Sequence, residues 1–96
     1  MERLDRILEE IDQLRGKLGN VRYRELDRIA RMVGRKLDTK RGGHPTFVNR
    51  ERNWYPLTIP NHPGSMVKRT VQSILDQLED DVMRLKQEKE GKDYGE

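Results

Sequence analysis

The sequence predicts a small α+β fold, in which helices pack on one face of a three-stranded antiparallel sheet. Two apolar stripes with helical spacing come first in the chain, strand-like segments separated by turn residues follow, and a third helical stripe comes last. A chain of 96 residues has room for one domain with a modest core. Because a three-stranded meander is stable only when helices cover one face, the other face is left open for a ligand.

The first two predicted elements are helices. The first covers residues 3–18, and Gly16 and Gly19 are stop signals near its end. The second runs from about residue 22 to 33, and Gly34 closes it where a left-handed conformation is favoured. Apolar residues spaced three or four apart form one stripe on the first helix: Leu4, Ile7, Leu8, Ile11, Leu14 and Leu18. The second stripe is Leu26, Ile29, Ala30 and Val33.

Three strands are predicted next. The first strand, residues 35–40, shows a weak alternation of apolar and polar residues, and we expect Leu37 to point into the core. A glycine-rich turn leads to the second strand, residues 44–49. The third covers residues 54–59, and Pro56 indicates a sheet edge or a bulge, because proline has no N–H for the ladder.

The last predicted helix begins near Lys68 and continues into the high eighties. Its apolar face consists of Val71, Ile74, Leu75, Leu78, Val82 and Leu85. Its acidic segment, residues 76–81, is expected to be a solvated face. We therefore divide the chain into an extra N-terminal helix (residues 1–19), a main domain (residues 20–90) and a flexible tail (residues 91–96).

Charge is strongly segregated along the chain. Residues 1–14 hold two Arg and five acidic residues, and residues 76–96 hold four basic and eight acidic residues. Between them, residues 15–69 hold fourteen Lys or Arg and only four acidic residues. A basic middle between acidic ends is typical of a surface that binds the phosphates of a nucleic acid. The alternative, that these cations only solvate helix faces, stays open.

The composition also excludes several classes of protein. There is no cysteine, which rules out a disulfide scaffold, a thiolate metal site and a cysteine nucleophile. Two histidines without a carboxylate at ligand spacing argue against zinc, so we expect no metal and no other cofactor. No apolar run approaches the roughly 20 residues that span a membrane, and the start does not have the pattern of a secretory signal. We expect a soluble, cytoplasmic protein.

The segment best suited to chemistry is Lys40-Arg41-Gly42-Gly43-His44. Glycines let the backbone approach a bulky anion, and cations hold a phosphate and stabilise charge that develops on it. An imidazole moves a proton near neutral pH, because its unperturbed pKa is about 6.5. RNA cleavage requires these parts, so His44 is the candidate acid–base residue and the four residues before it are candidate RNA-binding residues. A histidine that is merely exposed beside a hairpin turn is the alternative.

Three further features of the sequence bear on RNA binding. Lys68 and Arg69 open the last helix, where cations oppose the helix dipole, so we assign them to RNA binding. His62 lies in a Pro-Asn-His-Pro-Gly loop, and we favour a role in organising that loop. Trp54 and Tyr55 are suited to stacking on a base, but we favour packing at the core and the sheet edge.

These segments resemble the HicA family of bacterial toxins, small mRNA-cleaving proteins with a fold like the double-stranded-RNA-binding domain. The resemblance covers residues 21–80, and an N-terminal helix before them resembles a longer variant of the family. The family usually has Ser where this chain has Gly43, and Pro45 follows the histidine here. The segments that carry the resemblance are Arg41-Gly42-Gly43-His44, Phe47, Leu57-Thr58-Ile59-Pro60-Asn61-His62, Val67-Lys68 and Val71-Gln72-Ser73-Ile74-Leu75.

The resemblance implies a metal-independent endoribonuclease, the toxin of a type II toxin–antitoxin pair. It makes His44 the catalytic histidine and Arg41 the cation that precedes it, with mRNA as the substrate and a HicB-like antitoxin protein as the partner that covers His44. The departure at Gly43 keeps an alternative open, a non-catalytic RNA-binding module of the same fold. A third possibility is a protein-interaction domain that oligomerises through its helices, and the oligomeric state stays open.

Overall fold

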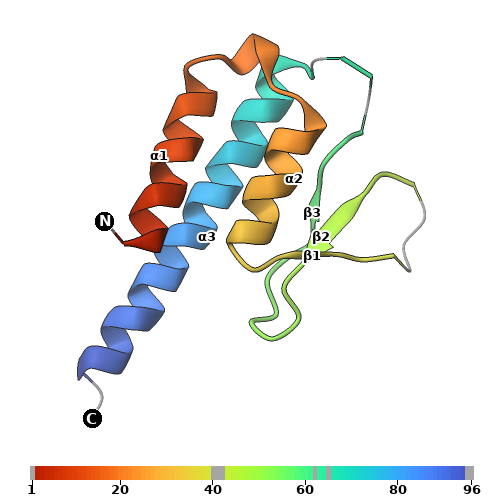
Figure 1. Cartoon of the computed structure of the whole chain (residues 1–96). Coiled ribbons are helices and arrows are strands. Elements are labelled where there is room, and N and C mark those ends of the chain that lie inside the picture. The colour runs from red at the N-terminus through yellow and green to blue at the C-terminus, as the bar shows by residue number, and fades with distance from the viewer. Residues whose placement is uncertain (1, 40–42, 62, 65, 95–96) are drawn as a thin grey trace.

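The apolar stripes and the strand-like segments form the α+β architecture that the sequence predicts. A computed structural model describes residues 2–39, 43–61, 63–64 and 66–94. Three helices lie on one side of a three-stranded antiparallel sheet (Figure 1). In chain order the elements are α1 (Arg3–Arg15), the 3-10 turn η1 (Leu18–Asn20), α2 (Tyr23–Met32), β1 (Lys36–Leu37), β2 (Thr46–Val48), β3 (Leu57–Thr58) and α3 (Lys68–Tyr94).

The helix ends follow local hydrogen bonding. α1 stops at Arg15, three residues before the predicted end, and the N–H of Gly16 bonds to the carbonyls of Asp12 and Gln13. Gly16 has a φ of −75°, so this end is not a left-handed glycine cap, and the chain tightens into η1 instead. Gly34, in contrast, has a φ of +98° after α2, which confirms the predicted left-handed position.

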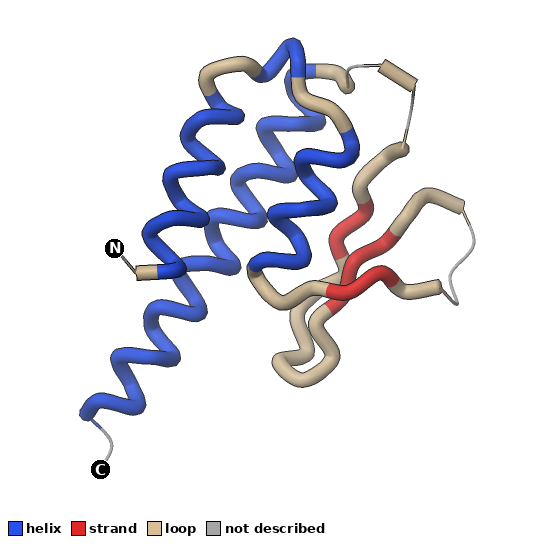
Figure 2. Tube along the Cα trace, viewed as in Figure 1, coloured by secondary structure: helices blue, strands red, loops and turns tan. Residues whose placement is uncertain are grey.

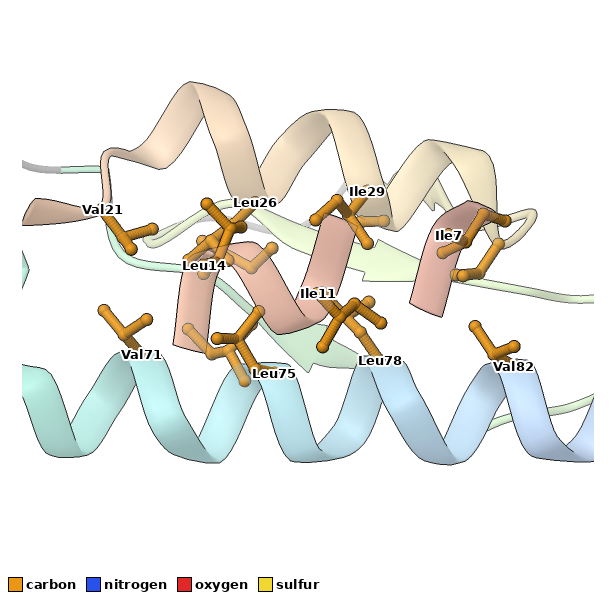
Figure 3. Close-up of a cluster of buried hydrophobic side chains, with 14 of the residues drawn as sticks. Ile7, Ile11, Leu14, Val21, Leu26, Ile29, Val71, Leu75, Leu78 and Val82 are labelled. Atoms are coloured by element: carbon orange, nitrogen blue, oxygen red, sulfur yellow. The ribbon is translucent and has the colours of Figure 1, made fainter. Parts of the chain in front are cut away.

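α1, α2 and α3 share one hydrophobic core. Figure 3 shows side chains of α1 lying between those of α2 and α3. Ile7 and Ile11 of α1 are at most 1% exposed, as are Leu26 and Ile29 of α2 and Leu78 of α3. Complete burial of such a side chain stabilises the fold by about 1.5–3 kcal/mol. The N-terminal helix, which we separated from the main domain, therefore packs as part of the same unit.

The sheet is smaller than the sequence predicts (Figure 2). Its order is β1-β2-β3, and Phe47 of β2 pairs with Leu37 on one side and Leu57 on the other. Phe47 is fully buried and lies beside Tyr23, with 6.4 Å between ring centroids. The expectation that Leu37 points into the core is wrong, because this residue is 37% exposed. β1 is a two-residue edge strand, so Leu37 has a strand neighbour on one side only.

α3 is the longest helix, and two predictions about it are wrong. It continues to Tyr94, past residue 91, where we placed the start of a flexible tail. Its acidic segment is not solvated throughout, because the side chain of Asp81 is fully buried against Arg35. The remaining acidic residues of that segment are exposed or half-buried. No helix of the described residues combines the length and the apolar character that crossing a membrane requires.

Candidate nucleic-acid interface

The backbone around His44 is held by the sheet, and the residue itself is exposed. The Thr46 hydroxyl donates a hydrogen bond to the carbonyl of His44 at 3.2 Å. One residue further, the N–H of Ile59 donates to the carbonyl of Pro45 at 3.0 Å. These bonds place the imidazole at the solvent-facing entry to β2. Three predicted RNA-binding residues, Lys40, Arg41 and Gly42, lie outside the described residues, as does His62.

Gly43 precedes His44 in a left-handed conformation, with a φ of +81°. An added Cβ would meet no atom within 4 Å, so space does not require glycine here. The backbone conformation does favour it, because left-handed φ costs an L-residue roughly 1–2 kcal/mol. This preference is a physical reason for glycine at position 43.

The sheet register brings the loop after β3 next to His44. Thr46 pairs with Thr58 in an antiparallel ladder, so the residues after Thr58 leave the sheet beside the residues before Thr46. The loop then reaches the helices, where the N–H of Met66 donates to the carbonyl of Val21 at 3.4 Å. Residues 59–66 therefore connect the His44 end of the sheet to the starts of α2 and α3 (Figure 1).

A groove of about 570 Å³ lies between this loop and the first turn of α2. Arg22 and Arg24 contribute exposed guanidinium groups to it, and neither forms an ion pair with a described residue. The other lining residues are Tyr23, Glu25, Asn61, Pro63 and Gly64. The groove is therefore positive and open at the surface. Sequence analysis missed both arginines, although cations in the first turn of a helix were the signal that we applied to α3.

Glu25 is the one carboxylate among the residues that line this groove, and its charge is already engaged. Lys17 donates to Oε2 at 2.7 Å, and the N–H of Arg22 donates to Oε1 at 3.0 Å. Burial opposes ionisation of Glu25, but the hydrogen bonds from Lys17 and from the Arg22 backbone outweigh it and lower the pKa of the carboxyl. Glu25 therefore stays ionised and paired with Lys17, and its charge also attracts the Arg22 guanidinium.

Lys68 and Arg69, the other predicted RNA-binding residues, are exposed at the first turn of α3 and form no ion pair with described residues. Lys68 lies beside η1, where its Cε would be 2.9 Å from a Cβ added to Gly19. It lines a separate hollow of about 420 Å³ with residues 15–20. The structure thus does not bring Lys68 into one pocket with His44.

The two aromatic residues behave differently from each other. The Trp54 ring is half-buried, and the guanidinium carbons of Arg35 and Arg52 lie 5.3 and 5.9 Å from its centroid. Packing is confirmed for Trp54. The prediction that Tyr55 also packs is wrong, because Tyr55 is 84% exposed. Tyr55 lies before β3, at the end of the sheet away from His44, so the antiparallel register separates it from the candidate site.

Within the described part of the chain, no three His, Asp or Glu side chains lie close enough together to hold a metal ion. Comparison with protein-family models, with curated proteins and with solved structures finds no match to this chain. Its function must therefore be argued from the chemistry of this surface.

Proposed function

We propose that the chain is a HicA-like endoribonuclease, the toxin of a type II toxin–antitoxin pair, which cleaves mRNA in the cytoplasm without a metal. The observation that carries the proposal is the position of His44, an exposed imidazole at the entry to β2 beside a loop that borders a positive groove. RNA is the substrate, and a HicB-like antitoxin that covers His44 is the protein partner.

In this proposal, His44 acts as the acid–base residue for attack of a ribose 2′-hydroxyl on the adjacent phosphate. The new P–O bond forms as the bond to the 5′ oxygen breaks, the imidazole takes up the hydroxyl proton, and solvent water protonates the departing 5′ oxygen. Lys40 and Arg41 stabilise the charge on the phosphate. Positioned acid–base catalysis contributes typically about 10²–10⁴-fold, which one histidine with a cationic clamp can supply.

The test is cleavage of an end-labelled mRNA fragment by the purified protein in the presence of a chelator. The wild type should cleave the RNA, and His44→Ala should be at least about 100-fold slower. His44 is exposed, so the variant should keep its circular dichroism spectrum and melting temperature. Tyr55→Ala, an exposed aromatic at the other end of the sheet, is the matched control and should cleave normally. Equal cleavage by wild type and His44→Ala would sink the assignment.

A non-catalytic RNA-binding module is the second candidate, and the glycine at position 43 favours it. A serine hydroxyl that oriented the imidazole or contacted the phosphate would be missing here. This candidate predicts that wild type and His44→Ala bind RNA equally and that neither cleaves it. Induced expression would then leave bacterial growth and transcript levels unchanged.

A further inference from the structure

We propose that the groove between the first turn of α2 and the loop after β3 binds the sugar–phosphate backbone of a single RNA strand that leaves the His44 site. Arg22 and Arg24 are the phosphate-binding residues. This inference rests on the proposed function, because it extends the substrate of the same site.

The cations of the described residues differ in whether a carboxylate pairs with them. Ten Lys and Arg side chains of the described residues form ion pairs with carboxylates. Arg22 and Arg24 form none within the described residues, although they lie only two positions apart at one groove. Glu25, the carboxylate beside them, is held by Lys17 at 2.7 Å. Two guanidinium groups that line one groove, each without an ion pair to a described carboxylate, are suited to the phosphates of a polyanion.

One wall of the groove starts beside the residues next to His44. The loop that forms one wall of the groove begins at Ile59, whose N–H is bonded to the carbonyl of Pro45. It is fixed at its other end by the Met66–Val21 hydrogen bond. Between these ends, the described residues Asn61, Pro63 and Gly64 line the groove, so a strand whose scissile phosphate lies at His44 can follow them toward the two arginines. The exposed Asn61 on this wall adds an amide for sugar or phosphate oxygens.

The size of the groove bears on whether it binds a single RNA strand or a duplex. Shape-reading domains contact duplex RNA over about 16 base pairs and two minor grooves, which requires cations spread along an extended face. Here the groove measures about 570 Å³, and its guanidinium groups come from one helical turn. A single strand fits this arrangement better than a duplex does.

The test measures affinity for a labelled 12-nucleotide RNA over a range of salt concentrations, in the His44→Ala background so that cleavage cannot intervene. Arg22→Gln with Arg24→Gln removes both groove charges. The matched control, Arg6→Gln with Lys36→Gln, removes two exposed cations that form no ion pair with described residues and lie outside the groove. Melting curves check that all variants are folded.

The groove variant should bind at least about tenfold more weakly at low salt, and its slope of log K against log salt should be shallower by about 1.4, because each phosphate contact to a single strand contributes about 0.7. The control should keep the parent slope. Equal losses in both double variants overturn the proposal, as does the absence of RNA binding by the parent. Tighter binding of a duplex than of the strand overturns the assignment to single-stranded RNA.

Cleavage is scored separately from binding. A shallower slope in the groove variant, together with cleavage that persists in His44→Ala, retains the groove as an RNA site and rejects the proposed nuclease centre. Cleavage that depends on His44, together with an unchanged slope in the groove variant, keeps the nuclease and rejects the groove.

Discussion

Arg35 and Asp81 form a fully buried, bidentate ion pair that joins the entry of β1 to α3. Nε of Arg35 lies 2.6 Å from Oδ2 of Asp81, and Nη2 lies 3.1 Å from Oδ1. The remaining nitrogen, Nη1, donates to the carbonyls of Phe47 at 3.0 Å and Tyr55 at 2.9 Å. One guanidinium group thus connects β2 and the segment before β3 to Asp81 of α3, which is 46 residues from Arg35 in sequence. Because the sheet is so short, this ion pair is a main link between the sheet and the helices.

Replacing Arg35 should therefore unfold the protein easily. Arg35→Ala leaves the carboxylate of Asp81 buried without its partner, and we expect a loss of about 3–5 kcal/mol in the free energy of unfolding. Urea denaturation followed by circular dichroism measures it. The control is Arg84→Ala, which breaks the exposed pair with Asp80 and should cost under about 1 kcal/mol. Similar losses for the two variants would show that the buried pair has no special role.

Truncating α1 side chains should test whether this helix belongs to the core. Ile11 is 1% exposed between α2 and α3, so Ile11→Ala should cost about 2–5 kcal/mol. Gln13 is exposed on the same helix, and Gln13→Ala should change stability by less than about 0.5 kcal/mol. Thermal melts of both variants provide the comparison. A cost below 1 kcal/mol for Ile11→Ala would mean that α1 is only loosely attached.

Two glycines at helix ends should respond differently to alanine. Gly34 has a φ of +98°, and an added Cβ would lie 3.3 Å from Nδ2 of Asn49. Gly34→Ala should cost roughly 1–2 kcal/mol. Gly16 has a right-handed φ of −75° and only ordinary contacts, so Gly16→Ala should cost nothing measurable. Chemical denaturation of the two variants distinguishes them, and equal effects would contradict the assignment of strain to Gly34.

Stability should fall in acid. The hydrogen bond from Lys86, at 2.5 Å, lowers the pKa of Asp5, and the pKa of Glu25 is lowered as described above. A carboxyl with a lowered pKa in the folded state stabilises the fold fully above its unfolded pKa of about 4, and that stabilisation is lost as the pH falls through the folded value. Melting temperatures should therefore drop from pH 5 to pH 2. Asp5→Asn should flatten this dependence, and an unchanged profile in that variant would contradict the role of the Asp5–Lys86 pair.

The helices could be predicted because their information is local. Leu4, Ile7, Ile11 and Leu14 are spaced at three and four, and this periodicity alone places them on one buried face of a helix. The strand ends were overestimated for the opposite reason. A residue joins a ladder only if a partner strand pairs with it in regular register, and such pairing covers only Thr46 to Val48 of the predicted second strand.

The candidate site was predicted only in part, for the same reason. The turn composition identified His44, but the pairing of Thr46 with Thr58 decides that the loop after β3 lies beside it. Arg22 is some twenty residues earlier in the chain, and it reaches that loop because the Met66–Val21 hydrogen bond draws the two segments together.

Local patterning thus determined the helices, the order of the elements and the left-handed Gly34, because each depends on residues a few positions apart. The tertiary structure alone decided which charges are free. Asp81 and Arg22 are each one charged residue among many in the sequence, yet Asp81 is buried against Arg35 while Arg22 lies open in a groove. Burial and ion pairing depend on elements far apart in the chain, so they are fixed only when those elements pack.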